Sequence, residues 1–390
     1  MEQKQGQAHS IGACFAALED PRVERTTWHS LEAIVAIALC ATICGADGWV
    51  EIAAFGEAKE AWFATILDLP RGIPSHDTFG RVFAALDPEQ FEACFRDWVA
   101  GVGARLGLDL AGDGVGRVVA LDGKTLRRSH DRGAGTAALH LVNAWASEAR
   151  LVLAQRAVRA KASELGALPE VLALLALKGC IVTIDAMGTH ASVAQAIVDK
   201  EADYVLALKD NQPRLFADVQ ALFADAEAVA FRGVEHRTDR RVDGGHGRVE
   251  IRQAWAITDP AHLRYLDPDG AWPHLRSIAM VRAERRSGDR TTQEVRYYLS
   301  SLDGPGVAHT LNGAVRAHWG IENGLHWTLD VAFREDESRV RTGHAAHTLA
   351  LRRRIALTLL QHEPTARCGI KAKRLKAGWD HRYLLKVLAG

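Results

Sequence analysis

The first hundred or so residues carry apolar positions at helical spacing. Residues 31–46, LEAIVAIALCATICGA, are almost continuously apolar, and Ser30 stands before them where a helix cap is expected. In GIPSHDTFGRVFAALD, residues 72–87, Ser75 offers a second cap and the apolar residues recur every three or four positions. We therefore expect an α-helical N-terminal domain over residues 1–110, either a helix-turn-helix-like DNA reader or a packing and assembly domain.

The pattern then becomes β-like. Three short runs rich in β-formers follow one another closely, as in an antiparallel meander, at 117–126, 138–147 and 151–158. Further strand-like runs then alternate with helical segments, the strands at 180–184 and 203–209 and the helices at 164–179, 191–202 and 213–228. Three strands followed by alternating strands and helices predict an α/β unit over 111–230, with a mixed sheet and helices on its faces.

The periodicity changes twice more before the end of the chain. Residues 231–302 are β-like, with loops rich in Gly, Asp and Arg, and predict a β-rich insertion. Helical spacing returns over 303–363, which we expect to complete the α/β core. The stretch 107–117, GLDLAGDGVGR, is expected to be a glycine-rich linker, because its G-x-G-x-G precedes a strand and so does not fit a dinucleotide fingerprint.

Charge and composition add two expectations. The formal net charge is zero, but residues 331–390 hold thirteen Lys and Arg against five Asp and Glu. Residues 364–390 are therefore expected to form a basic C-terminal tail, either solvated or in contact with phosphates. The six cysteines form no C-x-x-C pair, and no apolar stretch is long enough to span a bilayer, so a cytoplasmic protein is expected.

Two of the β-like runs each lead into a single acidic residue, Asp122 in RVVALDGKTL and Asp185 in CIVTIDAMG. Taken singly, each aspartate is explained as a strand-end cap or a turn residue. The order of elements, however, is that of an RNase H-like fold, in which the first and fourth strands are neighbours and these carboxylates would lie side by side. Adjacent carboxylates repel, and a divalent cation removes that penalty. Two such ions about 4 Å apart can activate an attacking oxygen and stabilise a leaving one.

A third acidic ligand is expected from a late helix. The stretch AHWGIENGLHW, residues 317–327, supplies Glu322, and Trp319, His326 and Asp330 fall near the same helical face. Asp330 and Asp336 are rival carboxylates for this role.

Ordered motifs through most of the chain resemble the DDE transposases of bacterial insertion sequences, in the H-repeat-associated (ISAs-type) family. The motifs are CATICGADGW, GIPSHDTFGRVF, ALDGKTLRRS, LHLVNAWAS, VTIDAMG, ADYVLALKDNQ, GHGRVEIR and HWGIENGLHWTLDVAF. The resemblance implies an N-terminal associated domain, an RNase H-like catalytic core and a β insertion before the last acid. By motif, it implies a catalytic and metal-binding triad of Asp122, Asp185 and Glu322.

One departure concerns phosphate contacts. Related transposases carry Y-x-x-R-x-x-x-E-x-x-x-x-x-x-K around the glutamate, where this chain has Val315, His318 and Leu329. Those basic contacts therefore do not carry over. The residues expected to contact DNA are Lys124, Lys209, Arg248, Arg316, His318, Trp319, Lys371, Lys373, Arg374 and Lys376.

The function these expectations favour is a transposase that binds the terminal repeats of an insertion sequence, cleaves DNA at its ends and joins the 3′-OH to target DNA. It would use Mg²⁺ as two ions, replaceable by Mn²⁺, and would act on double-stranded DNA as a homodimer. The alternatives are a catalytically silent domesticated DNA-binding protein and a metal-dependent nuclease of the same fold. A phosphohydrolase with an Asp nucleophile would need D-x-D after the first strand, and LDGKT lacks the second Asp.

Overall fold

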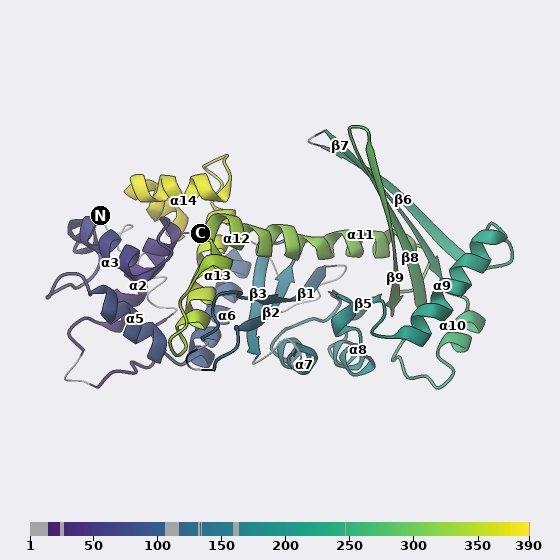
Figure 1. Ribbon diagram of the computed structural model, residues 1–390, viewed down its shortest axis with the longest axis horizontal. Coiled ribbons are helices and arrows are strands. Elements are labelled where there is room, and N and C mark those ends of the chain that lie inside the picture. Colours follow the sequence, from purple (N-terminus) through teal and green to yellow (C-terminus); the bar gives the residue numbers. More distant parts are fainter. Residues whose placement is uncertain are drawn as a thin grey trace.

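The computed structural model describes residues 15–389, apart from 24–26, 106–116, 132, 134, 159–163 and 246. Most of the expected linker at 107–117 lies outside these residues. One nine-stranded sheet runs through the molecule in the order β3-β2-β1-β4-β5-β9-β8-β7-β6, with helices on its faces (Figure 1).

The first five strands have the expected RNase H-like arrangement. β1 (Val118–Thr125), β2 (His140–Ala146) and β3 (Leu151–Val158) form an antiparallel meander. β4 (Ile181–Ile184) lies parallel to β1, and β5 (Asp203–Leu208) lies parallel to β4. The predicted fold class is therefore confirmed, including the contact between the first and fourth strands.

Alternation along β1 gives the sheet two apolar faces. Val119 and Leu121 pack into a core with α7 (Glu164–Ala173), α8 (Ala191–Val198) and α9 (Pro213–Ala228). Val118 packs on the opposite face with α11 (Val307–Gly320). Even-numbered residues of β1 therefore face α11, which decides where Asp122 points.

The β-rich segment continues the main sheet. β6 (His236–Gly245), β7 (Arg248–Ile257), β8 (Ser277–Ser287) and β9 (Arg290–Ser300) are antiparallel, and β9 pairs with β5. α10 (Pro260–Leu266) lies between β7 and β8 in the chain. The ends of the two hairpins project well beyond α11 (Figure 1).

The N-terminal helices and the C-terminal helices share one core. The N-terminal helices are α2 (Leu31–Ile43), α3 (Trp49–Ala58), α4 (Glu60–Phe63), α5 (His76–Ala85) and α6 (Pro88–Arg105). Phe83 and Phe95 from this set belong to the same apolar cluster as Leu351 and Ile355 of α13 (Ala345–His362). The N-terminal helices therefore do not form a core of their own.

The C-terminal segment expected as a basic tail is folded. It forms α14 (Ile370–Trp379) and α15 (His381–Ala389), whose residues Ala377, Leu384 and Val387 are buried in the same core. Apolar residues between the basic ones anchor both helices. Among the described helices, none has the length and apolar character needed to cross a membrane.

Candidate active site

Asp122 lies within β1, and its side chain is on the face of the sheet that packs against α11. The strand continues to Thr125, so Asp122 is inside the strand and not at its end as the sequence suggested. Its side chain is only 11% exposed. The backbone N–H of Gly123 donates a 2.9 Å hydrogen bond to its Oδ1.

Asp185 follows the last residue of β4 directly. Because Leu121 pairs with Ile184 in the parallel ladder, Asp122 and Asp185 occupy the next positions on neighbouring strands. Neighbouring strands are about 4.8 Å apart, so the two carboxylates start from adjacent backbone sites. Asp185 also caps the short helix η3 (Ala186–Gly188), accepting hydrogen bonds from the N–H groups of Met187 and Gly188.

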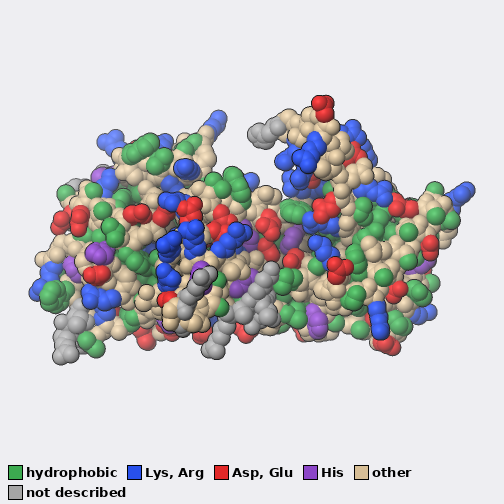
Figure 2. Space-filling view, in the orientation of Figure 1, with side chains coloured by type: hydrophobic (Ala, Val, Ile, Leu, Met, Phe, Trp, Pro, Cys, Tyr) green, Lys and Arg blue, Asp and Glu red, His purple; other side chains and the backbone are tan. Residues whose placement is uncertain are grey.

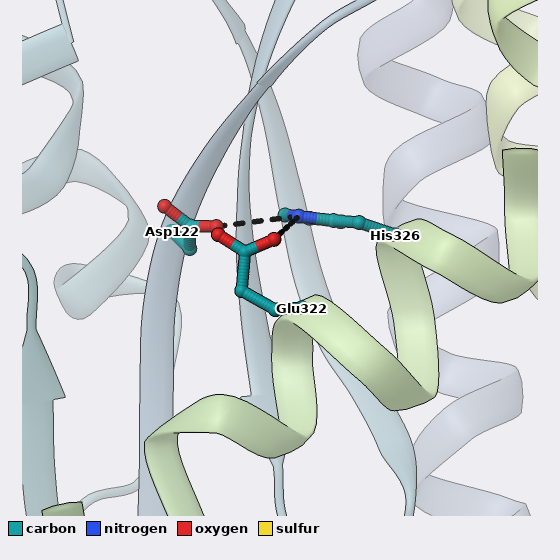
Figure 3. Close-up of side chains that lie close together, drawn as sticks. All are labelled: Asp122, Glu322 and His326. Atoms are coloured by element: carbon teal, nitrogen blue, oxygen red, sulfur yellow. Dashed lines mark ion pairs between the residues drawn. The ribbon is translucent and has the colours of Figure 1, made fainter. Parts of the chain in front are cut away.

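Glu322 and His326 come from a π-helical segment, η4 (Ile321–His326), between α11 and α12 (Trp327–Phe333). His326 Nδ1 lies 3.2 Å from Asp122 Oδ2 and 4.0 Å from Glu322 Oε2. Figure 3 shows the three side chains converging between β1 and this helix. Single π turns inside α-helices are frequent at functional sites, because the widened turn re-aims side chains.

The two carboxylates have opposite pKa shifts. Burial raises the pKa of Asp122, but the hydrogen bond and charge of His326 outweigh it and leave the pKa below its ordinary value. The pKa of Glu322 is raised, first by burial and then by the negative charge of Asp122. Asp122 is thus held as the anion, while Glu322 retains a proton to higher pH than usual.

The donor atoms fit a divalent cation. One ligand atom from each of Asp122, Glu322 and His326 lies within 4.8 Å of the others. His326 Nε2 is also buried without a hydrogen-bond partner among the described residues. Carboxylate oxygens suit Mg²⁺ and Mn²⁺, and a cation would remove the repulsion that raises the pKa of Glu322. Asp185 is adjacent in the sheet but is not a member of this close group.

Lys124 is bound to carboxylates beside the site. It is 8% exposed, and its Nζ lies 2.8 and 2.7 Å from the two carboxylate oxygens of Asp330 and 3.6 Å from Asp336 Oδ1. The expectation that Lys124 contacts DNA is therefore not supported by its surroundings. The same pairing explains why Asp330, a rival for the third ligand, is turned toward Lys124.

The other expected DNA contacts around the sheet fall into two groups. Lys209, Arg248 and Arg316 are exposed, after β5, at the hairpin end of β7 and on α11 respectively. His318 was expected to contact DNA, but its Nδ1 lies 2.9 Å from Thr183 Oγ1, and its pKa is lowered mainly by burial. Trp319 is half-buried, with the guanidinium of Arg296 4.3 Å from its ring centroid.

The basic residues of α14 also fall into two groups, one at least partly exposed and one buried. Lys371 is exposed, and Lys376 is half-buried with its Nζ 4.4 Å from the ring of Tyr383. Lys373 is buried and donates to the backbone oxygens of Leu360 and Glu363. Arg374 is buried and donates to backbone oxygens, including that of Thr42 at 2.9 Å. The phosphate-contact interpretation is therefore wrong for Lys373 and Arg374, whose donors are used inside the fold.

Sequence reasoning missed the role of His326 and the arginines beneath the site. The i+4 spacing placed His326 on the face of Glu322, but no local pattern indicated its contact with Asp122. Arg354, fully buried, donates to Asn143 Oδ1 at 2.8 Å and to Glu335 Oε1 at 3.0 Å. Asn143 is the residue of β2 that pairs with Asp122. The buried ion pair between Arg354 and Glu335 is therefore linked through Asn143 to the strand position next to Asp122.

The comparisons with known proteins cover nearly the whole chain. Residues 13–99 match the family described as DDE_Tnp_1-associated, and residues 113–359 match the family described as Transposase DDE domain. The "H repeat-associated putative transposase YhhI" of Escherichia coli strain K12 is 35% identical, over 94% of this chain and 95% of its own length. The "Uncharacterized protein in dhlA 3'region" of Xanthobacter autotrophicus is 43% identical, over 74% of this chain and 92% of its own length.

Among solved structures, the piggyBac transposase synaptic complex with hairpin DNA aligns with 95% of this chain and 75% of that chain, at 9% identity and a TM-score of 0.40. The family assignment does not depend on this alignment. It rests on the match over residues 113–359, together with the relative that is aligned along almost its full length. The chain belongs to the DDE transposase family and carries the DDE-associated domain ahead of the DDE domain.

Proposed function

We propose that this protein binds the terminal repeats of an insertion sequence, cleaves the DNA at its ends and joins the freed 3′-OH to target DNA. The observation that carries the proposal is the convergence of Asp122, Glu322 and His326 beside the β4 position that holds Asp185. Family membership supplies the class of reaction. The proposed catalytic residues are Asp122, Asp185 and Glu322.

These three carboxylates would hold the divalent cations, with Mg²⁺ as the expected metal and Mn²⁺ as a substitute. Bound there, the cations would neutralise charge on the attacking and leaving oxygens of phosphoryl transfer. His326 keeps Asp122 ionised and oriented, which favours cation binding without a proton having to leave first. Glu322 must release its proton when a cation binds, because its pKa is raised in the metal-free site.

A DNA path is available above the site. Figure 2 shows a hollow between the projecting hairpins and the rest of the molecule, with Lys and Arg side chains on the hairpin side. A cavity of about 180 Å³ between the β-rich strands and α11 is lined by Arg252, Arg285, Arg296 and Arg316, together with Glu250 and Glu294, which pair with Arg252 and Arg296. Cations on a concave wall favour phosphate backbones. We propose that duplex DNA lies in this hollow and that two protomers assemble on it.

The test is a cleavage and strand-transfer assay with labelled duplexes that carry the element's own terminal repeats. We expect Mg²⁺ and Mn²⁺ to support both steps, and Ca²⁺ to support binding with little chemistry, because its coordination is larger and looser. Asp122→Asn, Asp185→Asn and Glu322→Gln should each lower both rates by orders of magnitude while DNA affinity is retained. Asp218→Asn, an exposed change on α9, is the matched control.

Each alternative predicts a different outcome. Cleavage without joining would identify a nuclease, and binding without cleavage in any of the three cations would identify a silent DNA-binding protein. Full activity of Glu322→Gln, with loss of activity in Asp330→Asn, would show that the third ligand is assigned to the wrong carboxylate.

A further inference from the structure

A second cationic cavity lies away from the carboxylates. It measures about 920 Å³, is open to solvent, and is lined by the start of α3, by α5, by the loop 334–343 and by Arg353 of α13. Figure 2 shows Lys and Arg side chains gathered around α12 and α13, the region of this loop. We call it the arginine pocket.

Arg353 forms the buried wall of the arginine pocket. The residue is 2% exposed, and its Nη2 is buried with no hydrogen-bond partner in the described part of the chain. The acids whose charges act on it most strongly are Glu335 and Asp47. Arg354 already binds Glu335 at 3.0 Å, and Arg374 binds Asp47 at 3.2 Å. A buried guanidinium with an unused donor is costly unless an anion reaches it.

Three of the four acids that line the arginine pocket are engaged. Asp47 is bound by Arg374, whereas Asp77 is exposed and lies 3.5 Å from His76. Glu51 accepts from the backbone N–H groups of residues 47 and 48, and Glu337 pairs with Arg334. By contrast, Arg81 and Arg339 are exposed and make no ion pair with any described residue. The donors left for a ligand are therefore cationic.

The loop 334–343 is fixed against α5 and reaches the active site. The N–H of His344, directly after the loop, donates 2.9 Å to the oxygen of Ala84. At the other end, Asp336 lies 3.1 Å from Arg127 Nε and 3.6 Å from Lys124 Nζ, and Lys124 is on the same face of β1 as Asp122. A DNA strand that left the carboxylates along this loop would pass the exposed Arg127 on its way to the arginine pocket.

We infer that the arginine pocket binds a backbone phosphate of the DNA strand that passes through the active site. Arg353 donates from the wall, and Arg81 and Arg339 donate from the rim. Planar guanidinium groups suit this role because they present paired donors to phosphate oxygens. The inference rests on the proposed function for the identity of the strand, and the chemistry it requires is a phosphate group.

The experiment scans the DNA with single methylphosphonates, which remove the charge of one phosphate at a time. In the wild-type protein, one position on the strand should lower affinity by roughly tenfold or more, as for a hydrogen bond to a charged group. In Arg353→Met, the unmodified DNA should already bind that much more weakly, and the methylphosphonate at that position should add nothing. The salt dependence of log K should flatten by about 0.9 for the lost contact.

Arg352→Met is the matched control. Arg352 is equally buried and its guanidinium nitrogens also lack hydrogen-bond partners among the described residues, but it packs on the rings of Trp49 and Phe83 and does not line the pocket. Its replacement should leave the salt dependence and the methylphosphonate profile unchanged. Arg353→Met should also keep or raise the melting temperature, because an apolar side chain replaces an unpaired buried cation. A large fall in melting temperature with an unchanged profile would overturn the inference and make Arg353 structural.

Two further results separate the possibilities. If inorganic phosphate alone stabilises the wild type but not Arg353→Met, and no DNA position couples to Arg353, the pocket takes a small phosphate and the DNA assignment fails. If the wild type cleaves its DNA without any such coupling, the inference fails and the proposed function stands. Coupling in a protein that does not cleave would support the pocket and count against the transposase reaction.

Discussion

At the scale of single residues, Glu363 shows how a carboxylate is stabilised inside the fold. It is 2% exposed and accepts hydrogen bonds from Thr365, from the Ala366 N–H and from the Tyr383 hydroxyl. Burial raises its pKa, but the hydrogen bonds from Thr365 and Tyr383 outweigh burial and bring the pKa to about 2. Because the pKa is about 4.3 in an unfolded chain, folding favours the ionised form.

This shift predicts an acid sensitivity. The stabilisation is complete above a pH of about 4.3 and is lost as the pH falls from there toward 2, because the unfolded chain takes up the proton first. Glu363→Gln should therefore melt at a lower temperature than the wild type at pH 7, and the difference should shrink by pH 3. Glu57→Gln, an exposed change in α3, is the control. Parallel melting curves for Glu363→Gln and the wild type over this range would contradict the assignment.

His326 supports a prediction about metal affinity. It contacts Asp122, a proposed metal ligand, at 3.2 Å, and the loss of a residue that orients a ligand typically weakens metal binding 10–100-fold. We expect His326→Gln to weaken Mn²⁺ binding by about that factor in calorimetric titration. His309→Gln, an exposed change near the start of α11, should bind Mn²⁺ as the wild type does. Equal affinity in both variants would show that His326 does not contribute to the proposed metal site.

The sequence could identify acids by their position after β-like runs, but it could not determine the environment of the cations. Lys373 and Arg374 stand in a run of basic residues and looked solvent-facing. They are buried because α14 packs on α2 and α13. The contact between Arg374 and Thr42, for example, joins residues more than 300 positions apart in the sequence. Long-range packing of this kind leaves no local pattern.

At the scale of elements, the turn after β4 fixes Asp185. Gly188 ends η3, and a Cβ there would stand 2.7 Å from Leu168 Cδ1 and even closer to Ile184 Cγ2. Gly188→Ala should therefore lower the free energy of unfolding by about 1–3 kcal/mol, as overpacking does. It should also reduce any activity that depends on Asp185.

The control for this change is another glycine in a helix. Gly166 lies in α7 with open space around its added Cβ, and Gly166→Ala should raise the free energy of unfolding by roughly 0.5–1 kcal/mol. Urea denaturation measures both variants. A Gly188→Ala protein as stable as the wild type would mean that the turn shifts without cost and does not hold Asp185 tightly.

The element that sequence spacing could not predict is η4. Apolar periodicity predicted helical structure over 303–363, and the structure has α11 and α12 within this range, separated by the π segment Ile321–His326. Ideal i+4 spacing put Glu322 and His326 on one face, which is correct. The widened turn carries both residues toward Asp122, and Gly324 within it lies close to Trp145, to which an added Cβ would come within 3.2 Å.

At the scale of the whole molecule, the domain boundaries expected from the sequence divide the chain into consecutive segments, whereas the hydrophobic core joins helices from both ends of the chain. α13 has fifteen of its eighteen residues buried, so it is covered on all sides and acts as a central helix. It packs on α2, α5 and α6 as well as on β3. The sequence marked the N-terminal helices as a unit because they are consecutive, and could not show that residues 345–360 complete their core.

This shared core predicts that the DDE domain does not fold alone. A chain that begins at residue 117 would expose the side of α13 that Phe83 and Phe95 cover, and each large apolar side chain contributes about 1.5–3 kcal/mol by burial. We expect this shortened chain to be insoluble or to melt without a cooperative transition, and co-expression with residues 1–116 to restore both properties. In the full-length protein, Phe83→Ala should lower the free energy of unfolding by about 3–5 kcal/mol within a single transition. A shortened chain that stays monomeric and melts cooperatively at the full-length temperature would show two independent domains and return the boundary to residue 110.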